Sequence, residues 1–349
     1  MLTSLALLQN FWLKNILCFF ATFLIALFSV KKYIKFVNKK GFFQPIRKDG
    51  PETHLAKKKT PTMGGIFIVL STLVSTLLFA DIKNPYILTT IFVFITFAAI
   101  GLTDDLMKVI YKNPQGFRGS FKIAIQFLIV GIAYVHLSGI DYFHMKTSVF
   151  LPFGKGDWIV IPKVLYIIFI TFVIVGSSNA VNLTDGLDGL VSVPTIINIL
   201  CLGTMIFIIS DSNLSDKYLV HQVVGSQELL TFCSALIGGI LGFLAFNLKP
   251  AKIFMGDVGS LALGSVLGLM AIIIKQEIVF FVISLVFVAE AVSVILQVGS
   301  YKLRKKRIFL MAPLHHHFEK LGWSEKKVVR SFWASSLLCA VVGMAIFLI

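Results

Sequence analysis

Charged residues are scarce in this chain. Asp, Glu, Lys and Arg together make up 14% of it, whereas an ordinary soluble domain has about 25%. Acidic residues are the rarer sign, with 17 Asp and Glu against 32 Lys and Arg. Hydrophobic residues reach 57%, and the mean hydropathy is +0.88. This composition excludes a soluble globular protein and predicts an all-α polytopic membrane protein, with one integral membrane domain over residues 1–349.

Cysteine is also rare. The four cysteines stand singly within apolar runs, and no C-x-x-C spacing points to a metal site or a redox pair. No internal repeat is visible, so an inverted-repeat transporter has no direct support. The chain also lacks a soluble module studded with aromatic residues, so we expect no nucleic-acid partner.

Long apolar runs dominate what is present. They centre near residues 24, 72, 95, 129, 171, 199, 238, 266, 288 and 340. Each is about 17 to 22 residues long, which is the length that a bilayer core requires. We therefore expect about ten transmembrane helices, with a short hairpin between residues 137 and 162.

The basic residues predict an orientation. Of the 32 Lys and Arg residues, 25 lie in the loops that follow the odd-numbered runs. The positive-inside rule makes those loops cytoplasmic and places both termini outside. The formal net charge of +15 has two readings, topogenic bias or a surface for anionic partners such as phospholipids and nucleotide diphosphates. The polar clusters at 104–105, 179–188, 247–260 and 315–317 also follow odd-numbered runs, which predicts one active site on the cytoplasmic face.

The segment N-L-T-D-G-L-D-G-L carries polar side chains between two apolar runs. Asn179, Asn182, Asp185 and Asp188 recur every three residues, which spreads them over roughly half the circumference of a helix. An ionised Asp inside a membrane helix costs about 2.5 to 3.5 kcal/mol, so such residues imply a watery cavity or a membrane boundary. We interpret them as a ligand site. The alternative is a polar loop that caps two helices, with Asp188 as the N-cap of the second.

Three further aspartates point to phosphate and metal chemistry. Asp104 and Asp105 are adjacent, so at least one of them is expected to meet a cation or share a proton, and Lys122 nearby is suited to a phosphate. Gly256 opens an apolar helix whose N-terminus suits a phosphate. Asp257 would repel that phosphate unless a divalent cation such as Mg²⁺ bridged them. The alternative reading of Asp257 is a plain N-cap.

The run P-L-H-H-H-F-E holds His315, His316 and His317. Three adjacent imidazoles converge poorly on one metal ion, so we favour hydrogen bonding to an anionic substrate. Glu290 and Gln297 belong to the ninth apolar run. The basic first loop, which ends in T-P-T-M-G-G, is suited to lipid head groups or to a more specific anionic ligand.

Taken in order, these motifs carry a resemblance. T-P-T-M-G-G, D-D, N-L-T-D-G-L-D-G-L, F-N-x-x-P-A-x-I-F-M-G-D-V-G-S-L-A-L-G and P-L-H-H-H-F-E resemble the phospho-N-acetylmuramoyl-pentapeptide-transferases, a family of polyprenyl-phosphate N-acetylhexosamine-1-phosphate transferases. The resemblance covers nearly the whole chain. It implies Mg²⁺-dependent transfer of phospho-MurNAc-pentapeptide from UDP-MurNAc-pentapeptide to undecaprenyl phosphate, giving lipid I and UMP. This reaction is the first membrane step of peptidoglycan synthesis, so the resemblance also implies the bacterial cytoplasmic membrane.

The resemblance also implies residue roles. Asp257 matches the family's magnesium ligand, and Asp104 is the candidate base on the lipid phosphate. The catalytic set that it implies is Asp104, Asp105, Asp257, Lys57 and Lys122. The substrate-binding set is Thr62, Asn179, Asn182, Asp185, Asp188, Asn247, Phe254, Gly256, Ser260, Gln297, His315, His316 and His317, with Phe254 stacked on uracil and the histidines near the muramoyl group. Lys59 stands where the family usually has Gly, which leaves open which of Lys57, Lys58 and Lys59 acts in the cleft.

Two rival functions and two details stay open at this point. One rival is a sister enzyme that uses UDP-GlcNAc, and the other is a cation-coupled transporter that uses Glu290 near mid-membrane. The reaction is either a direct displacement or a two-step route through a phospho-aspartyl enzyme at Asp257 or Asp104. The sequence is also compatible with a monomer or a homodimer.

Overall fold

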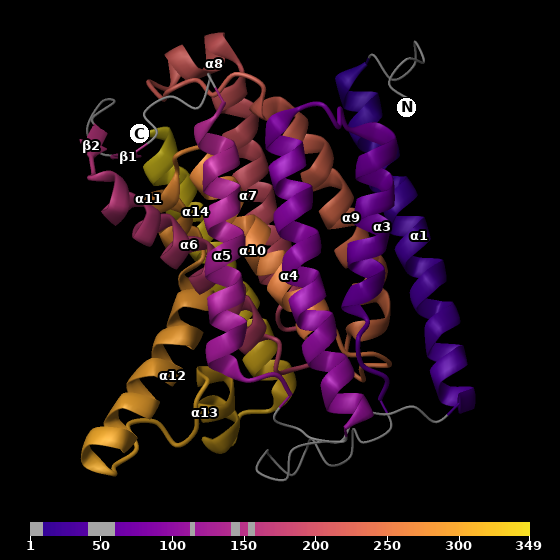
Figure 1. Cartoon of the computed structure of the whole chain (residues 1–349). Helices are drawn as coiled ribbons and strands as arrows, with labels where there is room; N and C mark the ends of the chain where they lie inside the picture. The colour runs from indigo at the N-terminus through magenta and orange to yellow at the C-terminus, as the bar shows by residue number, and fades with distance from the viewer. Residues whose placement is uncertain (1–9, 41–59, 112–115, 141–146, 153–157) are drawn as a thin grey trace.

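The apolar runs fold into helices that stand side by side in one bundle (Figure 1). The computed structural model describes residues 10–40, 60–111, 116–140, 147–152 and 158–349. Within these ranges, eight helices are long and apolar enough to cross a membrane. They are α1 (Phe11–Lys40), α4 (Pro85–Ile110), α5 (Gly119–Ser138), α6 (Lys163–Thr184), α7 (Ser192–Ser210), α9 (Leu229–Asn247, preceded by the 3₁₀ turn η3, Ser226–Glu228), α12 (Leu285–Arg304) and α14 (Glu325–Leu348).

Two shorter apolar helices, α3 (Gly65–Phe79) and α10 (Asp257–Ile273), complete the bundle. All ten predicted apolar runs are therefore helical, and the chain is an all-α polytopic membrane protein, while ten complete crossings stay a prediction. The ninth run is not one helix. It breaks at Ser284 into α11 (Glu277–Ile283) and α12, and the Ser284 hydroxyl donates to the carbonyl of Phe280 at 2.6 Å. Below this break α12 leaves the bundle obliquely (Figure 1).

Helix α10 forms the centre of the bundle. Every residue of α10 after Asp257 is buried, and the helix packs against α3, α4, α6 and α7. A helix that is apolar on all sides belongs in a core rather than at a surface. Because other helices cover α10, its 17 residues can be fewer than a helix in contact with lipid would need. Its first residue, Asp257, therefore lies inside the bundle.

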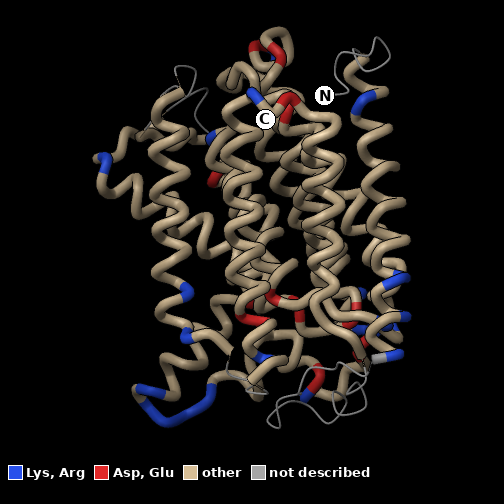
Figure 2. The backbone as a smooth tube through the Cα atoms, turned by 45° about the vertical axis from the view of Figure 1, so that its right-hand side comes forward, with Lys and Arg blue, Asp and Glu red and all other residues tan. Residues whose placement is uncertain are grey.

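The two ends of the bundle differ. The start of α1 and the end of α14 lie at one end (Figure 1). That end also carries α8 (Ser212–Lys217) and the predicted hairpin, in which β1 (Ser148–Phe150) pairs antiparallel with β2 (Trp158–Val160). The short helix α13 (Leu314–Lys320) lies at the other end, where most Lys and Arg residues gather (Figure 2).

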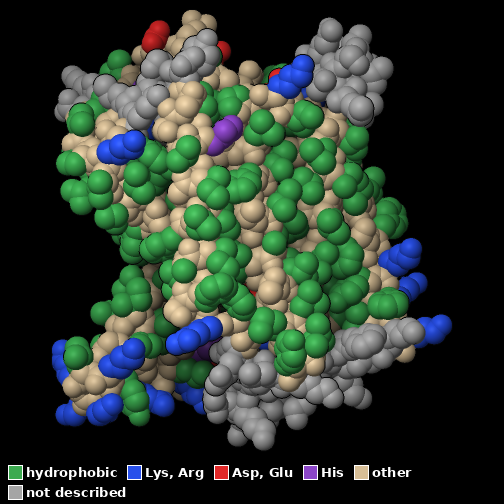
Figure 3. All heavy atoms as spheres, viewed as in Figure 1, with side chains coloured by type: hydrophobic (Ala, Val, Ile, Leu, Met, Phe, Trp, Pro, Cys, Tyr) green, Lys and Arg blue, Asp and Glu red, His purple; other side chains and the backbone are tan. Residues whose placement is uncertain are grey.

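The side of the bundle is apolar. Figure 3 shows hydrophobic side chains over the helices between the two ends, with basic side chains gathered at the lower end of the view. Exposed large hydrophobic residues occur on α1, α5, α12 and α14 among other helices. This distribution fits a surface that faces lipid, where exposed apolar groups carry no penalty.

Candidate active site

Two helices bring the aspartates together. Asp104 and Asp105 lie near the end of α4, and Asp257 is the first residue of α10. Gly101 lets these helices approach, because a Cβ atom at this position would lie 2.2 Å from the carbonyl oxygen of Asp257. Carboxylate oxygens of the three aspartates lie within 4.8 Å of one another. We call Asp104, Asp105, Asp257, Lys108 and Lys122 the Asp-Lys cluster.

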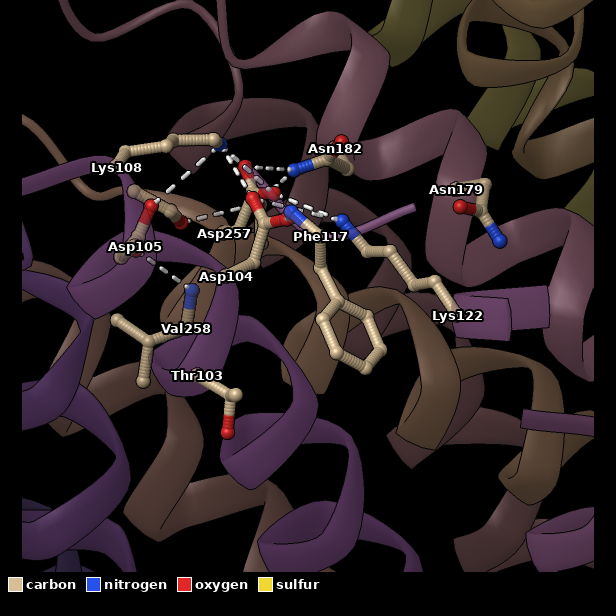
Figure 4. A network of polar contacts seen from close by, with 12 residues as sticks. Thr103, Asp104, Asp105, Lys108, Phe117, Lys122, Asn179, Asn182, Asp257 and Val258 are labelled. Carbon is tan, nitrogen blue, oxygen red and sulfur yellow. Dashed lines mark hydrogen bonds and ion pairs between the residues drawn. The ribbon is translucent and has the colours of Figure 1, made fainter. Parts of the chain in front are cut away.

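The two lysines neutralise these carboxylates. The ammonium of Lys108 pairs with Asp104, and it lies 3.2 Å from Oδ2 of Asp257 and 3.8 Å from Oδ1 of Asp105. The ammonium of Lys122, from the start of α5, lies 2.8 Å from the same Oδ2 of Asp257 (Figure 4). The prediction that the adjacent carboxylates meet a cation is confirmed. Three carboxylates and two ammonium groups leave the cluster with one negative charge in excess when all are ionised.

Backbone groups fix two of the carboxylates. The Phe117 N–H donates to Oδ1 of Asp104 at 2.7 Å, and the Val258 N–H donates to Oδ2 of Asp105 at 3.2 Å. Asp105 therefore caps α10 from a neighbouring helix, and Gly256 occupies the N-cap position. The alternative reading of Asp257 as a plain N-cap is wrong. Its carboxylate faces the lysines instead.

Helix α6 contributes an amide to the cluster. Asn182 Nδ2 donates to Oδ1 of Asp257 and to Oγ of Ser260, at 2.8 Å in each case. Asn179, one turn earlier, donates to Oε1 of Gln126 on α5 at 2.9 Å, and Figure 4 shows its side chain lying away from the aspartates. The two asparagines of this motif therefore face different partners.

Asp185 lies just beyond the end of α6 and adds a carboxyl group beside the cluster. Burial raises the pKa of Asp185 well above its usual range. The nearby charges of Asp257 and Asp105 raise this pKa further, whereas a hydrogen bond from the Gly256 backbone lowers it. Gly256 has a φ of +78°, a backbone conformation that L residues rarely adopt.

Asp188 and Asn247 hold loops together. Oδ2 of Asp188 accepts the Ala251 N–H at 3.0 Å, and Oδ1 of Asn247 accepts the Gly189 N–H at 3.0 Å. The alternative of Asp188 as a helix N-cap is wrong, because Val191 takes that position on α7. Both residues thus order the loop that carries Asp185.

The T-P-T-M-G-G segment packs beside the stretch of chain that leads into α10. The Phe254 N–H donates to the Pro61 carbonyl, and the Gly64 N–H donates to the Phe254 carbonyl, each at 2.8 Å. Thr62 is buried, and its carbonyl accepts the Tyr33 hydroxyl at 3.1 Å. Lys57, Lys58 and Lys59 lie outside the described residues.

The remaining predicted residues lie on α12 and α13. The Gln297 amide bonds the backbone of Ile308 and Phe309, so it fastens the segment that follows α12. Nδ1 of His317 accepts the Leu310 N–H at 3.2 Å, and His316 pairs with Glu319 at 2.7 Å.

His315 is the histidine that approaches the loop of Asp185. A Cβ atom placed on Gly186 would lie 2.2 Å from its Nε2. The ring of His315 therefore lies directly on the backbone of Gly186.

Sequence reasoning missed two charged residues of this region, Lys108 and Glu325, and gave a third, Glu290, no role in this site. Lys108 lies three and four residues beyond the adjacent aspartates, and this helical spacing is a signal that could have found it. Glu325, which accepts the Asp188 N–H at 3.2 Å, is 137 residues away in the chain. Glu290, which bonds His315, was singled out only for a transporter. Such long-range partners leave no local signal.

The cluster fits a hard divalent cation. Asp104, Asp105 and Asp257 each offer an oxygen to a common point, and magnesium prefers oxygen ligands that include one or two carboxylates. The excess negative charge of the cluster suits the cation, and the nearby ammonium groups suit a diphosphate held through that cation.

Comparisons with known proteins decide the family. Residues 87–275 match the family model of glycosyl transferase family 4, and residues 57–69 match signature 1 of the phospho-N-acetylmuramoyl-pentapeptide-transferases. A phospho-N-acetylmuramoyl-pentapeptide-transferase of Francisella tularensis subsp. tularensis is 45% identical over 326 residues, which cover 92% of this chain and 89% of the relative. The chain belongs to this transferase family.

Relatives of the same name extend the match. The transferase of Francisella philomiragia is 45% identical over 325 residues, and that of Francisella tularensis subsp. novicida is 44% identical over 326 residues. Each alignment covers 92% of this chain and 89% of the relative. The family match over 87–275 spans α4 to α10 and so includes all three aspartates of the cluster. The transferase signature ends in α3, and its described part lies against the segment that leads into α10.

Proposed function

We propose that this protein transfers phospho-MurNAc-pentapeptide from UDP-MurNAc-pentapeptide to undecaprenyl phosphate, giving lipid I and UMP in the first membrane step of peptidoglycan synthesis. The observation that carries this proposal is the Asp-Lys cluster at the start of α10. It lies in a membrane protein whose relatives carry the name of this transferase.

The reaction is a phosphoryl transfer. An oxygen of the lipid phosphate forms a bond to the phosphorus that bears MurNAc, and the bond from that phosphorus to the oxygen of UMP breaks. Such a transfer depends mainly on positioning and on neutralising the phosphate oxygens. Lys108 and Lys122 supply two fixed positive charges for this purpose, both beside Oδ2 of Asp257.

Asp257 is the proposed magnesium ligand, with Asp104 and Asp105 beside it. Magnesium bound there supplies charge neutralisation at the donor diphosphate. Asn182 restrains one oxygen of Asp257, and the Val258 N–H restrains Asp105, so the carboxylates keep their directions. Ammonium groups released from these carboxylates can pair with phosphate oxygens.

A direct displacement fits this arrangement best. Two ammonium groups and one amide engage the Asp257 carboxylate, which lowers its nucleophilicity. A phosphate monoester has a second pKa of about 6 and is largely ionised near neutral pH. The base role proposed for Asp104 then reduces to orienting the lipid phosphate or to accepting its last proton.

The remaining predicted residues form the proposed donor site. Phe254 is proposed to stack on uracil, and the histidines of α13 are assigned to the muramoyl portion. The residues proposed to line this site are Lys57, Thr62, Asn179, Asn182, Asp185, Asp188, Asn247, Gly256, Ser260 and Gln297. We place this end of the bundle in the cytoplasm, because the donor is a soluble nucleotide and because basic residues gather there (Figure 2).

The test is UMP release by the detergent-purified protein, given a polyprenyl phosphate and Mg²⁺. One arm supplies UDP-MurNAc-pentapeptide, one supplies UDP-GlcNAc, and one adds a chelator. Asp257→Asn keeps the shape of the side chain but removes the charge, and Gly299→Ala on the exposed part of α12 is the control. We expect chelator-sensitive release from the muramoyl donor alone, lost in Asp257→Asn. Release only from UDP-GlcNAc would assign the sister reaction.

A further inference from the structure

Glu290 forms a buried pair with His315. Both side chains have essentially no exposed surface. Oε2 of Glu290 lies 3.2 Å from Nδ1 of His315, and Oε1 accepts the backbone N–H of His315 at 3.1 Å. One carboxylate thus binds both the main chain and the ring of a residue 25 positions away. It also joins α12 to the start of α13.

This pairing favours one tautomer of the neutral His315 ring. An ionised carboxylate only accepts hydrogen bonds, so Nδ1 must carry a proton where it faces Glu290. In the neutral ring Nε2 is then an acceptor. Nε2 is buried and has no hydrogen-bond partner among the residues that the structure describes. The ring therefore keeps this nitrogen without a hydrogen bond on the side that faces Gly186.

The unused nitrogen points at the loop that carries Asp185. Gly186 has no side chain, and this is what allows Nε2 to lie directly on its backbone. Asp185 is the next residue, and it is hydrogen-bonded to the Gly256 backbone beside Asp257. The ring of His315 also lies next to that of His316, with centroids 4.1 Å apart and planes inclined at 60°. Glu290 thus contacts His315 directly, and through His315 it is linked to the loop that carries Asp185.

We propose that Glu290 is a positioning residue for the donor site: its carboxylate fixes the orientation and the Nδ1–H form of His315, so that the ring packs against Gly186 and holds the loop that carries Asp185 beside the cluster. This inference rests on the proposed function and adds a residue that lies outside its catalytic and binding sets. The inference also gives Glu290 a role other than cation transport, because Glu290 is bound to His315 beside the candidate active site.

Glu290→Gln is the deciding variant. A glutamine oxygen can still accept the His315 backbone N–H, but its NH₂ group then faces Nδ1. The ring is expected to change to the Nε2–H form, which directs an N–H group at the backbone of Gly186. The resulting displacement of the loop that carries Asp185 should raise the KM for UDP-MurNAc-pentapeptide by roughly tenfold to a hundredfold. The KM for the polyprenyl phosphate should not change.

Two further variants separate positioning from stability. Ser293→Ala is the matched control, because Ser293 is buried one turn from Glu290 and donates only to the Glu290 carbonyl at 2.7 Å. His315→Asn keeps a side-chain N–H for Glu290 but lacks Nε2. We expect Ser293→Ala to keep both KM values, and His315→Asn to raise the donor KM as Glu290→Gln does, with its melting temperature near that of the control.

The direct readout is the ¹⁵N spectrum of histidine-labelled protein, with His315 assigned by its loss in His315→Asn. Conversion of His315 from the Nδ1–H to the Nε2–H form in Glu290→Gln, together with the selective rise in donor KM, supports the proposal. An unchanged ring form, or an equal rise in both KM values, overturns it. If the wild-type protein releases no UMP, the proposed function fails, whereas the spectrum still decides whether Glu290 sets the ring of His315.

Discussion

Nδ2 of Asn182 lies 2.8 Å from Oδ1 of Asp257, although the two residues are 75 positions apart in the chain. The contact joins the end of α6 to the start of α10, and the opposite oxygen of Asp257 meets Lys108 and Lys122. Asp257 is thus surrounded by groups that donate hydrogen bonds. Any change in the charge of these groups should change what the cluster binds.

Replacing Asn182 with Asp tests this point. Asn182→Asp places a fourth carboxylate next to Asp257 and removes a hydrogen-bond donor, so the protein without magnesium should lose stability through repulsion. Mg²⁺ should restore more of it than in the wild type, because the added charge strengthens cation binding. The measurement is the melting temperature with and without Mg²⁺ at matched ionic strength.

Asn179→Asp is the matched control for this experiment, because the Asn179 amide faces Gln126 on α5. We expect its melting temperature to respond to Mg²⁺ as the wild type does. Equal responses in all three proteins would show that divalent cations do not bind beside Asn182.

Gly256 is expected to tolerate no side chain. Its φ is +78°, and a Cβ atom would lie 2.5 Å from Oδ2 of Asp105, the oxygen that caps α10. Gly256→Ala should cost about 1 to 3 kcal/mol of stability through backbone strain, and it should abolish UMP release by displacing Asp105.

Gly299→Ala is the control for Gly256→Ala, because nothing lies within 4 Å of a Cβ atom there and alanine favours the helix. The melting temperature and UMP release of both variants are the measurements. Wild-type values for Gly256→Ala would mean that Asp105 does not need its observed position.

Lys108 and a bound cation should compete for the same carboxylates. Lys108→Met removes the positive charge that contacts all three aspartates, so the affinity for Mg²⁺ should rise about tenfold or more. The turnover rate should fall at saturating Mg²⁺, because one phosphate-neutralising charge is lost. Titration with Mn²⁺, followed by electron paramagnetic resonance, measures the affinity independently of activity. A weaker affinity would place the cation away from Lys108.

The sequence predicted the helices and the gathering of polar clusters at one end, because length and hydropathy are strong local signals. The prediction was wrong where we continued the helical spacing beyond the end of the helix. Helix α6 ends at Thr184, so the three-residue interval of Asn179 and Asn182 does not continue on a helical face to Asp188. Asp188 instead bonds the Ala251 backbone. Within the helix, Gln126 on α5 determined the direction of Asn179, and no local pattern reveals such a partner.

The sequence also contains no recognisable signal for the helix break at Ser284. Ser284 lies in an apolar run without proline, and its hydroxyl bonds the carbonyl four residues earlier. The consequence is large, because the break lets α12 tilt and brings Glu290 to the histidines of α13. Composition indicated a buried acid, whereas only the three-dimensional arrangement identified its partner.

We expect His221 to make the other end of the bundle sensitive to acid. Its ring lies against Phe150 and Trp158 of the hairpin, with centroids 5.1 and 4.8 Å away. The pKa of His221 is lowered from 6.5 to about 4, mainly by burial of the ring, and the charge of Lys275 contributes to this lowering. The folded protein therefore resists protonation of this ring.

The sign of the pH effect follows from this lowered pKa. Between pH 6.5 and pH 4 the unfolded chain binds more protons at His221 than the folded chain does, so the free energy of unfolding falls as the pH falls. The loss should be on the order of 2 kcal/mol, after allowance for partial exposure of the ring. His221→Phe keeps an aromatic ring between Phe150 and Trp158 but cannot be protonated. Its melting temperature should fall less than that of the wild type between pH 7 and pH 4.5, and parallel curves would show that His221 titrates normally in the folded protein.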